Sequence, residues 1–267
     1  MNSSTVVYTT TDCFTALGSG NSIGCIPLAL GGGVCALTKI TGTTSDNIIS
    51  ARLVTASGEV QVVDKSTPDL LWAIKGAGQF FGIVTELELQ AYPLSVLGSD
   101  DGTIWTSKYI FDISKSGEVA QAAARLMDDE ENYSVGLSVI TANPMNGDPC
   151  VLVVAMYFGD SSSAEAFFSP IAALGPLAAM PERTDYQKVN DSFDVYCAKG
   201  GYKRFFLAGV PRFDPAPWQE ISQIFVELLG KYPEVGHGGY AYEWNSGKQK
   251  TIIADSAWAH RDLKCWV

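Results

Sequence analysis

The alternation of hydrophobic and polar positions predicts a group of strands in the first third of the chain. These strands are expected over residues 48–55, 59–63 and 83–89. A short helix is expected over residues 68–75, because Pro68 suits an early helical position and Gly76 suits the end of a helix. The segment before residue 48 is rich in Gly, Thr and Ser and holds one helix-sized apolar patch near residues 14–17.

After residue 97 the pattern changes to longer strands with helices between them. Strands are predicted over residues 103–111, 134–141, 150–158 and 238–244. Helices are predicted over residues 116–129, 163–174 and 217–231, and the stretch from 175 to 216 is expected to be irregular. Pro144 and Gly147 indicate a hairpin turn. The pattern predicts an antiparallel sheet covered on one face by helices, an α+β arrangement, with domains at 1–97 and 98–267.

Composition limits the classes of partner. The chain has 267 residues, 46% of them hydrophobic, which is enough for one large domain or two small ones. The net charge of −11 argues against nucleic acid and anionic membranes as partners. No segment has the pattern of a secretory signal or a membrane span. We therefore expect a cytoplasmic protein with a small-molecule substrate.

The cysteines and histidines do not form a metal-binding pattern. None of the six cysteines belongs to a Cys-x-x-Cys pair, which excludes zinc ribbons and thioredoxin-like motifs. Most have apolar neighbours and are expected to pack as small hydrophobic residues. With only two histidines, His237 and His260, a multi-histidine site is not expected, and no metal is predicted.

Three glycine-containing segments stand out in the first hundred residues. Leu-Gly-Gly-Gly at 30–33 lets the backbone approach a ligand or another strand closely, although a tight structural turn would use the same residues. Gly-Thr-Thr-Ser-Asp-Asn at 42–47 has the composition of a capped loop. The segment 68–85 predicts a helix, a glycine-rich loop and a strand, which suits either a ligand-binding loop or a plain crossover.

In order and spacing, these three segments resemble the flavin-binding domain of the vanillyl-alcohol oxidase and berberine bridge enzyme-like oxidoreductases. The match is dense from residue 23 to 93, and Ala-Trp-Ala-His-Arg at 257–261 resembles a stretch near the end of the family's substrate domain. The resemblance implies a partial PCMH-type FAD-binding domain over 1–97 and a substrate domain over 98–267. It also implies FAD-linked oxidation of a small metabolite in secondary metabolism, with the flavin carrying the redox chemistry.

The resemblance also implies which residues approach the flavin. Asp46 and Asn47 would stiffen a loop on the cofactor side, and the other positions would approach the flavin mainly through backbone atoms. The implied cofactor-binding residues are Ile23, Gly24, Gly31, Gly32, Gly33, Asp46, Asn47, Gly82, Ile83 and Val84.

The sequence departs from the family pattern at both ends. Family members carry an earlier flavin-binding subdomain, often with a histidine joined to FAD, and a C-terminal segment that returns to the flavin domain. The position of a second FAD-linked residue, a cysteine, falls near Gly20, and Pro27 stands where a glycine is usual. We expect a family member truncated at both ends. Three possibilities stay open: an incomplete gene product that cannot fold well, a fold completed by a second chain or by self-association, or a truncated fold from which FAD has been lost.

Candidate reacting groups lie near the C-terminus. If residues 238–244 form a strand, Tyr240, Tyr242 and Trp244 share one face, and a tyrosine there is a candidate acid or base. His260, next to Arg261, is a second candidate. A packed aromatic face and a structural His-Arg pair are the alternatives. For the whole protein, a cofactor-free pericyclase or isomerase and a non-catalytic small-molecule binder remain open beside the oxidoreductase.

Overall fold

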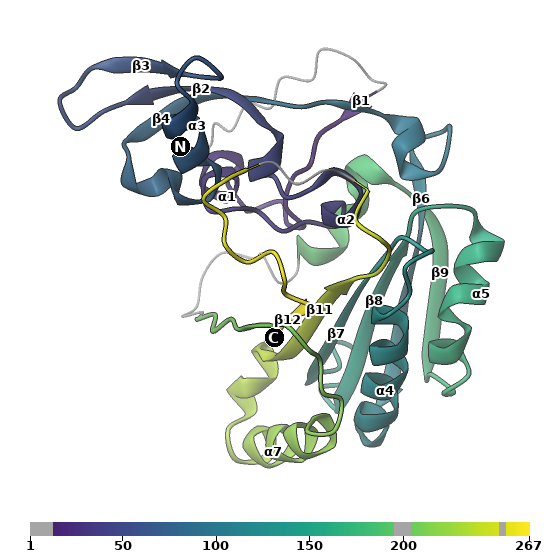
Figure 1. Ribbon diagram of the computed structural model, residues 1–267. Helices are drawn as coiled ribbons and strands as arrows, with labels where there is room; N and C mark the ends of the chain where they lie inside the picture. Colours follow the sequence, from purple (N-terminus) through teal and green to yellow (C-terminus); the bar gives the residue numbers. More distant parts are fainter. Residues whose placement is uncertain (1–12, 195–203, 251–254) are drawn as a thin grey trace.

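A seven-stranded antiparallel sheet forms the centre of the computed structural model, which describes residues 13–194, 204–250 and 255–267 (Figure 1). In spatial order its strands are β10 (Gly209–Val210), β12 (Cys265–Trp266), β11 (Gly239–Asn245), β7 (Ser134–Ala142), β8 (Pro149–Tyr157), β6 (Thr103–Asp112) and β9 (Ala178–Asp185). The turn between β7 and β8 closes with the Asn143 amide donating to the Asp148 carbonyl at 2.7 Å. The predicted hairpin is therefore confirmed.

Three helices cover one face of this sheet: α4 (Ser116–Met127), α5 (Ser161–Ala172) and α7 (Trp218–Lys231) (Figure 1). Their apolar sides pack on every second residue of the strands, because neighbouring side chains of a strand point to opposite faces. Trp105 of β6 stacks on Phe168 of α5 with ring centroids 5.4 Å apart, and both are fully buried together with Phe111 and Phe225. The predicted α+β arrangement is confirmed.

The opposite face of the sheet packs against the N-terminal third of the chain. Ile104 and Ile110 of β6 form a second buried cluster with Leu37, Ile40 and other residues. The covering segment contains β1 (Cys13–Phe14), α1 (Cys25–Leu30), α2 (Thr38–Thr41) and η1 (Ser45–Asn47), and β1 pairs with β5 (Tyr92–Pro93). β8 has apolar residues in nearly every position because both of its faces are covered.

A separate three-stranded sheet lies beside this arrangement in the order β3 (Val60–Val63), β2 (Ile48–Val54), β4 (Ile83–Leu89). Its inner face packs on α1 and α3 (Pro68–Ala77) through a third cluster that contains Leu30, Leu53 and Ile74. Besides η1, the short 3-10 helices of the described chain are η2 (Gly78–Phe80), η3 (Leu94–Leu97), η4 (Ile113–Lys115), η5 (Tyr186–Phe193) and η6 (Pro233–His237). Within the described ranges, no helix is long and apolar enough to cross a membrane.

Two sequence predictions are wrong. The apolar patch near 14–17 forms no helix, because Cys13 and Phe14 pair as a strand with Pro93 and Tyr92. The stretch predicted to be irregular contains β9, which pairs with β6 along eight residues. β9 is an edge strand with a largely exposed surface and a proline, so it lacks the alternation by which a strand is predicted. The domain boundary near residue 97 stays a prediction.

Cysteine burial follows the sequence prediction at three positions. Cys35, Cys150 and Cys265 are buried and free, and burial raises the pKa of each thiol to about 11. Cys197 lies outside the described residues.

Replacing Phe168 with alanine should lower the free energy of unfolding by about 3–5 kcal/mol, because it removes a fully buried ring and leaves a cavity beside Trp105. Denaturant unfolding followed by circular dichroism measures the change. Met145→Ala is the control, since Met145 is exposed in the hairpin turn and should change stability by less than about 0.5 kcal/mol. Equal effects of the two changes would contradict the packing of α5 on the sheet.

Candidate functional site

A cavity of about 60 Å³ lies where the loop before β2 meets β11, β12 and the last residues of the chain. Its walls come from segments that are distant in sequence. The Asn245 side chain donates to the Cys35 carbonyl at 3.2 Å, and the Gln249 side chain donates to the Thr38 carbonyl at 2.9 Å. The residues that give the cavity its chemistry are Lys39, Asp46, Glu243, Trp258, His260, Arg261 and Lys264.

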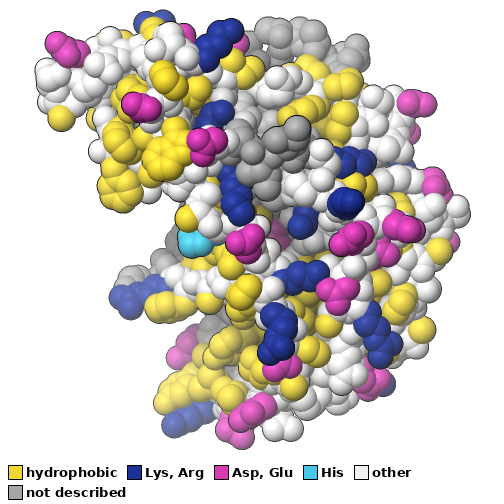
Figure 2. All heavy atoms as spheres, in the orientation of Figure 1, with side chains coloured by type: hydrophobic (Ala, Val, Ile, Leu, Met, Phe, Trp, Pro, Cys, Tyr) yellow, Lys and Arg dark blue, Asp and Glu magenta, His cyan; other side chains and the backbone are white. Residues whose placement is uncertain are grey.

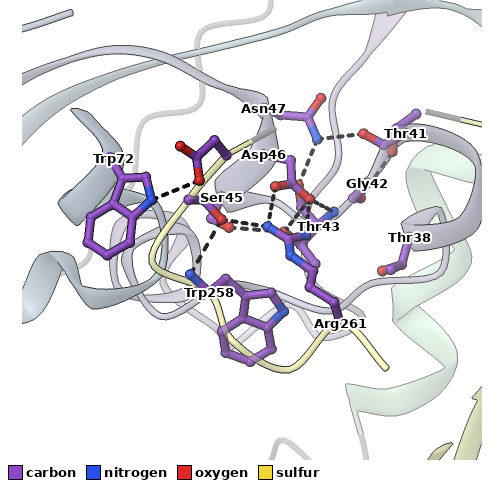
Figure 3. Close-up of polar contacts among 12 residues, drawn as sticks. Thr38, Thr41, Gly42, Thr43, Ser45, Asp46, Asn47, Trp72, Trp258 and Arg261 are labelled. Atoms are coloured by element: carbon purple, nitrogen blue, oxygen red, sulfur yellow. Dashed lines mark hydrogen bonds and ion pairs between the residues drawn. The ribbon is translucent and has the colours of Figure 1, made fainter. Parts of the chain in front are cut away.

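One buried ion pair joins these segments (Figure 3). The two terminal nitrogens of Arg261 donate to the two carboxylate oxygens of Asp46, each at 2.7 Å. The Asp46 side chain is 3% exposed and that of Arg261 20%. Arg261 also donates to Ser256 Oγ, while the Thr43 amide and hydroxyl donate to Asp46 at 2.9 and 2.8 Å. The pair thus fixes the C-terminal segment to the 42–47 loop, 215 positions earlier in the chain.

The electrostatics of Asp46 follow from these contacts. Burial by itself raises the pKa of the carboxyl, but the hydrogen bonds from Arg261 and Thr43 outweigh it, and the pKa is lowered. Gly42 is required beside it, since its φ is +83° and an added Cβ would lie 2.9 Å from Asp46 Oδ2. This loop is therefore shaped around an ionised carboxylate.

Asn47 holds the same loop from its other side. Its amide nitrogen donates to the carbonyls of Thr41 and Thr43 at 3.1 and 2.8 Å, and its amide oxygen accepts from the Tyr92 hydroxyl at 2.6 Å. Asp46 and Asn47 thus lie in a loop held by several side-chain hydrogen bonds, at the positions where the sequence predicted a loop. Their role toward a flavin stays a prediction.

The C-terminal segment also crosses α3. The Trp72 indole donates to Asp255 at 3.1 Å (Figure 3). The Trp258 amide donates to the Lys75 carbonyl at 3.1 Å. The Trp258 ring lies against Gly32, where an added Cβ would be 2.3 Å from the ring. Gly76, with φ of +121°, gives room to the Trp258 backbone. Both glycines are thus required by the passage of this segment.

The glycine segment at 30–33 closes helix α1. The Gly31 amide donates to the Pro27 and Leu28 carbonyls, and the Gly32 amide donates to the Ala29 carbonyl. The carbonyls of Gly32 and Gly33 accept from the amides of Ser45 and Thr44, each at 2.8 Å. Gly24 stands directly before α1, and Ile23 is exposed beside it. Contact of these five predicted residues (Ile23, Gly24, Gly31, Gly32 and Gly33) with a cofactor stays a prediction.

The predicted residues 82–84 lie at the beginning of β4. Gly82 has a φ of +150°, and an added Cβ would lie 2.3 Å from the Val54 carbonyl oxygen. Ile83 is exposed, and Val84 is buried on the inner face of the small sheet. Only glycine permits this close approach of two backbones, and the contact of the three residues with a flavin stays a prediction.

The structure separates the three predicted catalytic residues. The Tyr242 ring is buried between Phe213 and Trp218, with ring centroids 4.7 and 4.3 Å away, and burial raises the pKa of its hydroxyl. Tyr240 lies edge-on to Phe225 of α7. Both tyrosines are thus on the helix-covered face of β11, and neither lines the cavity. His260 does line it, with its ring 4.9 Å from that of Trp258. A catalytic role for the three stays a prediction.

Glu243 and Lys39 also line the cavity, although the sequence pattern did not indicate them as candidates. Glu243 lies on the face of β11 opposite Tyr242, lines the cavity, and has its pKa raised by burial. Within the described part of the chain its carboxylate has no hydrogen bond or ion pair. Lys39 lines the same cavity, and burial, followed by the nearby Lys264, lowers its pKa. Glu243 is the one charged residue in β11, and a single charge in an otherwise uncharged strand could have indicated it as a candidate from the sequence.

Arg261→Gln should lower the free energy of unfolding by about 3–5 kcal/mol, because it leaves the Asp46 carboxylate buried without its cation. Arg52→Gln is the matched control. It breaks the Arg52–Glu86 pair, which also joins a guanidinium and a carboxylate at 2.9 Å, but whose side chains are 49% and 68% exposed. The loss of this exposed pair should lower the free energy of unfolding by less than about 1 kcal/mol. Chemical denaturation of both variants gives the comparison. Similar losses of unfolding free energy in the two variants would show that burial does not increase the contribution of the Asp46–Arg261 pair to stability.

The lowered pKa of Asp46 also predicts how its contribution depends on pH. The ionised Asp46 carboxylate contributes its full stabilisation at pH values above the pKa of about 3.9 that it has in the unfolded chain. This stabilisation is lost as the pH falls through the lower pKa that Asp46 has in the folded chain. The difference in unfolding free energy between the natural chain and Asp46→Asn should therefore shrink below about pH 4. Urea unfolding of both proteins from pH 7 to pH 3 measures it. A difference that stays constant over this range would contradict the assignment.

No family model matches the chain. Among curated proteins, it is 27% identical over 274 residues to the FAD-linked oxidoreductase hasG of Aspergillus fumigatus, a match that covers 94% of this chain and 55% of hasG. It is 29% identical over 220 residues to the FAD-linked oxidoreductase fmqD of the same species, covering 82% and 44%. The chain thus spans about half the length of these relatives.

Solved structures show the same fold. BBE-like 1 of Physcomitrella patens superimposes with a TM-score of 0.72 at 18% identity, covering 96% of this chain and 56% of that one. A chitooligosaccharide oxidase superimposes with a TM-score of 0.68 at 20% identity and the same coverage. The chain is thus a relative of the FAD-linked oxidoreductases, as the sequence resemblance predicts, and it shares the fold of the berberine bridge enzyme-like oxidases over about half of their length.

Proposed function

We propose that this chain takes part in the FAD-linked oxidation of a small-molecule metabolite in secondary metabolism. The relatives that match most of its length are named FAD-linked oxidoreductases, and neighbours that share its fold include oligosaccharide oxidases. In this proposal the two domains meet near residue 97, and the reaction takes place at their junction. The protein acts in the cytoplasm. Because these relatives are named oxidoreductases, they do not favour the alternatives of a cofactor-free pericyclase or isomerase, or of a small-molecule binder without catalytic activity.

The backbone of the small sheet offers a donor set that suits a flavin. β4 pairs with β2 on one side, and on its other side its backbone polar groups have no strand partner among the described residues. A flavin ring presents carbonyl oxygens and ring nitrogens along one edge, which such groups can bind. Gly82, Ile83 and Val84 would hold the ring there, and the rigid 42–47 loop would support it. When bound, FAD supplies the acceptor for the hydride.

The observation that carries the proposal is Glu243 in the cavity. Removal of a hydride from an alcohol carbon also requires that the hydroxyl proton leave, and a base must accept it. Glu243 is a carboxylate without an ion pair among the described residues, and burial raises its pKa. The Glu243 carboxylate would accept the proton as the oxygen forms a carbonyl. His260 and Lys39 line the same cavity and would orient the substrate.

The visible spectrum of the purified chain, before and after FAD is added and free FAD removed, tests the cofactor. We expect flavin bands that stay with the protein, and bleaching of those bands by an oxidisable substrate. A folded chain that stays colourless after this treatment would exclude flavin binding by the chain alone.

Glu243→Gln should lower the turnover number by about 10²–10⁴-fold, because the amide cannot accept the proton. The amount of bound flavin should not change, since the two side chains have the same shape. Glu227→Gln on the exposed side of α7 is the control and should keep full activity. The rate and the flavin content of each variant are measured together. An unchanged turnover number in Glu243→Gln would show that Glu243 is not the base.

A further inference from the structure

A second cavity, of about 340 Å³, lies beside α2, which also borders the cavity that contains Glu243. α2 is a single helical turn, and its first two residues, Thr38 and Lys39, line the Glu243 cavity. Its last two residues, Ile40 and Thr41, line the second cavity. No described residue lines both. Sites for small molecules have volumes of about 300–1,000 Å³, so the second cavity is large enough to bind one.

The second cavity reaches from the core to the surface, and Figure 2 shows one face of the molecule with its mixture of hydrophobic and charged side chains. Ile40 and Phe158 in its lining are buried, Val96 of η3 is half-buried, and Ser95 and Lys250 are exposed. A ligand can therefore enter from solvent and place an apolar part against the buried residues. Removal of that apolar part from water favours binding.

Two tyrosines whose hydroxyls are already bonded complete the walls of the second cavity. The Tyr92 hydroxyl donates to the Asn47 amide oxygen at 2.6 Å, and the Tyr133 hydroxyl donates to the Lys248 carbonyl at 2.8 Å. Because these bonds hold both rings, a ligand would not have to order them on binding. Aromatic rings pack well on one another, stacked or edge-on. The walls thus suit a ligand with an aromatic body.

Lys250 is the charged residue of this lining. Its ammonium nitrogen lies 3.8 Å from the centroid of the Tyr133 ring, and its backbone amide donates to the Lys39 carbonyl at 2.8 Å. Within the described part of the chain, the ammonium has no ion pair and no hydrogen-bond acceptor. An ammonium has three N–H donors, and one ring cannot use all of them. Lys250 can therefore donate to an anionic group of a ligand.

The lining disfavours other classes of ligand. It contains no Asp or Glu, so a cation would find no opposite charge. The Thr41 hydroxyl already donates to the Leu37 carbonyl at 3.2 Å, and both tyrosine hydroxyls are also used as donors. A sugar would leave several of its hydroxyls without partners there. The net charge of −11 acts against anions at long range, but at physiological salt it is largely screened beyond about 8 Å.

We propose that the second cavity is a binding site for a small aromatic carboxylate. The aromatic body packs against Ile40, Val96 and the two tyrosine rings, and the carboxylate accepts from the Lys250 ammonium. Neither Glu243 nor the β4 edge lines this cavity. The site is therefore independent of whether the chain binds a flavin.

Equilibrium dialysis of the full chain with matched probes tests this proposal. The probes are 2-naphthoate, the uncharged 2-naphthamide of nearly the same shape, and acetate, which has the charge without the ring. We expect 2-naphthoate to bind with a dissociation constant of about 1 mM or lower. 2-Naphthamide should bind at least about tenfold more weakly, since it lacks the charge-assisted bond. An excess of acetate should not displace 2-naphthoate.

Three variants localise the bound probe. Lys250→Gln should weaken 2-naphthoate at least about tenfold and leave 2-naphthamide unchanged, because it removes the cation alone. Lys248→Gln is the matched control and should change neither, since Lys248 lines neither cavity. Val96→Phe adds a ring to the lining and should weaken both naphthyl probes. Thermal unfolding of each variant checks that the chain still folds.

Lys39→Gln separates the two cavities. Lys39 is a cation of the Glu243 cavity, and its backbone carbonyl still accepts from Lys250 in the variant, so 2-naphthoate should bind as before. No binding of 2-naphthoate, equal binding of 2-naphthoate and 2-naphthamide, or binding that Lys39→Gln weakens and Lys250→Gln does not would each overturn the site. A chain that binds the probe as expected but takes up no FAD would contradict only the proposed oxidation.

Discussion

The buried Asp46–Arg261 pair is the contact on which the arrangement of the site depends. It joins the 42–47 loop to the last residues of the chain, and the Thr43, Ser256 and Gly42 contacts are built around it. An isolated buried charge is costly, so neither residue can be displaced without exposing or neutralising the other. The C-terminal segment consequently passes over α3 and closes one wall of the cavity.

The large sheet supplies the opposite wall and decides which side chains reach it. Its helix-covered face takes Tyr242 and Trp244 into an aromatic core, and the other face takes Glu243 and Asn245 toward the N-terminal third. The strand that carries a structural tyrosine thus also carries the candidate base, one residue away. Burial acts on both, since it raises the pKa of Tyr242 and of Glu243.

The small sheet is built differently. Its inner face is packed on α1 and α3, and its exposed outer face carries apolar residues beside the Arg52–Glu86 ion pair, whereas the large sheet is covered on both faces. Under the proposed function, the free edge of β4 would offer backbone donors and acceptors to a flavin. The cavity with Glu243 lies elsewhere, against β11 and β12 of the large sheet.

Local periodicity was enough to predict β6, β7, β8, β11 and the helices α4, α5 and α7, since each buries one face and has the matching repeat. The spacing of the glycine segments was likewise enough to indicate the family. β9 and β1 were missed because their partners, and not their own patterns, make them strands. Alternation placed Tyr242 and Glu243 on opposite faces, but the position of α7 decided which face was buried. The pairing of Asp46 with Arg261 spans 215 positions, and no local pattern records a contact that exists only when the chain folds back on itself.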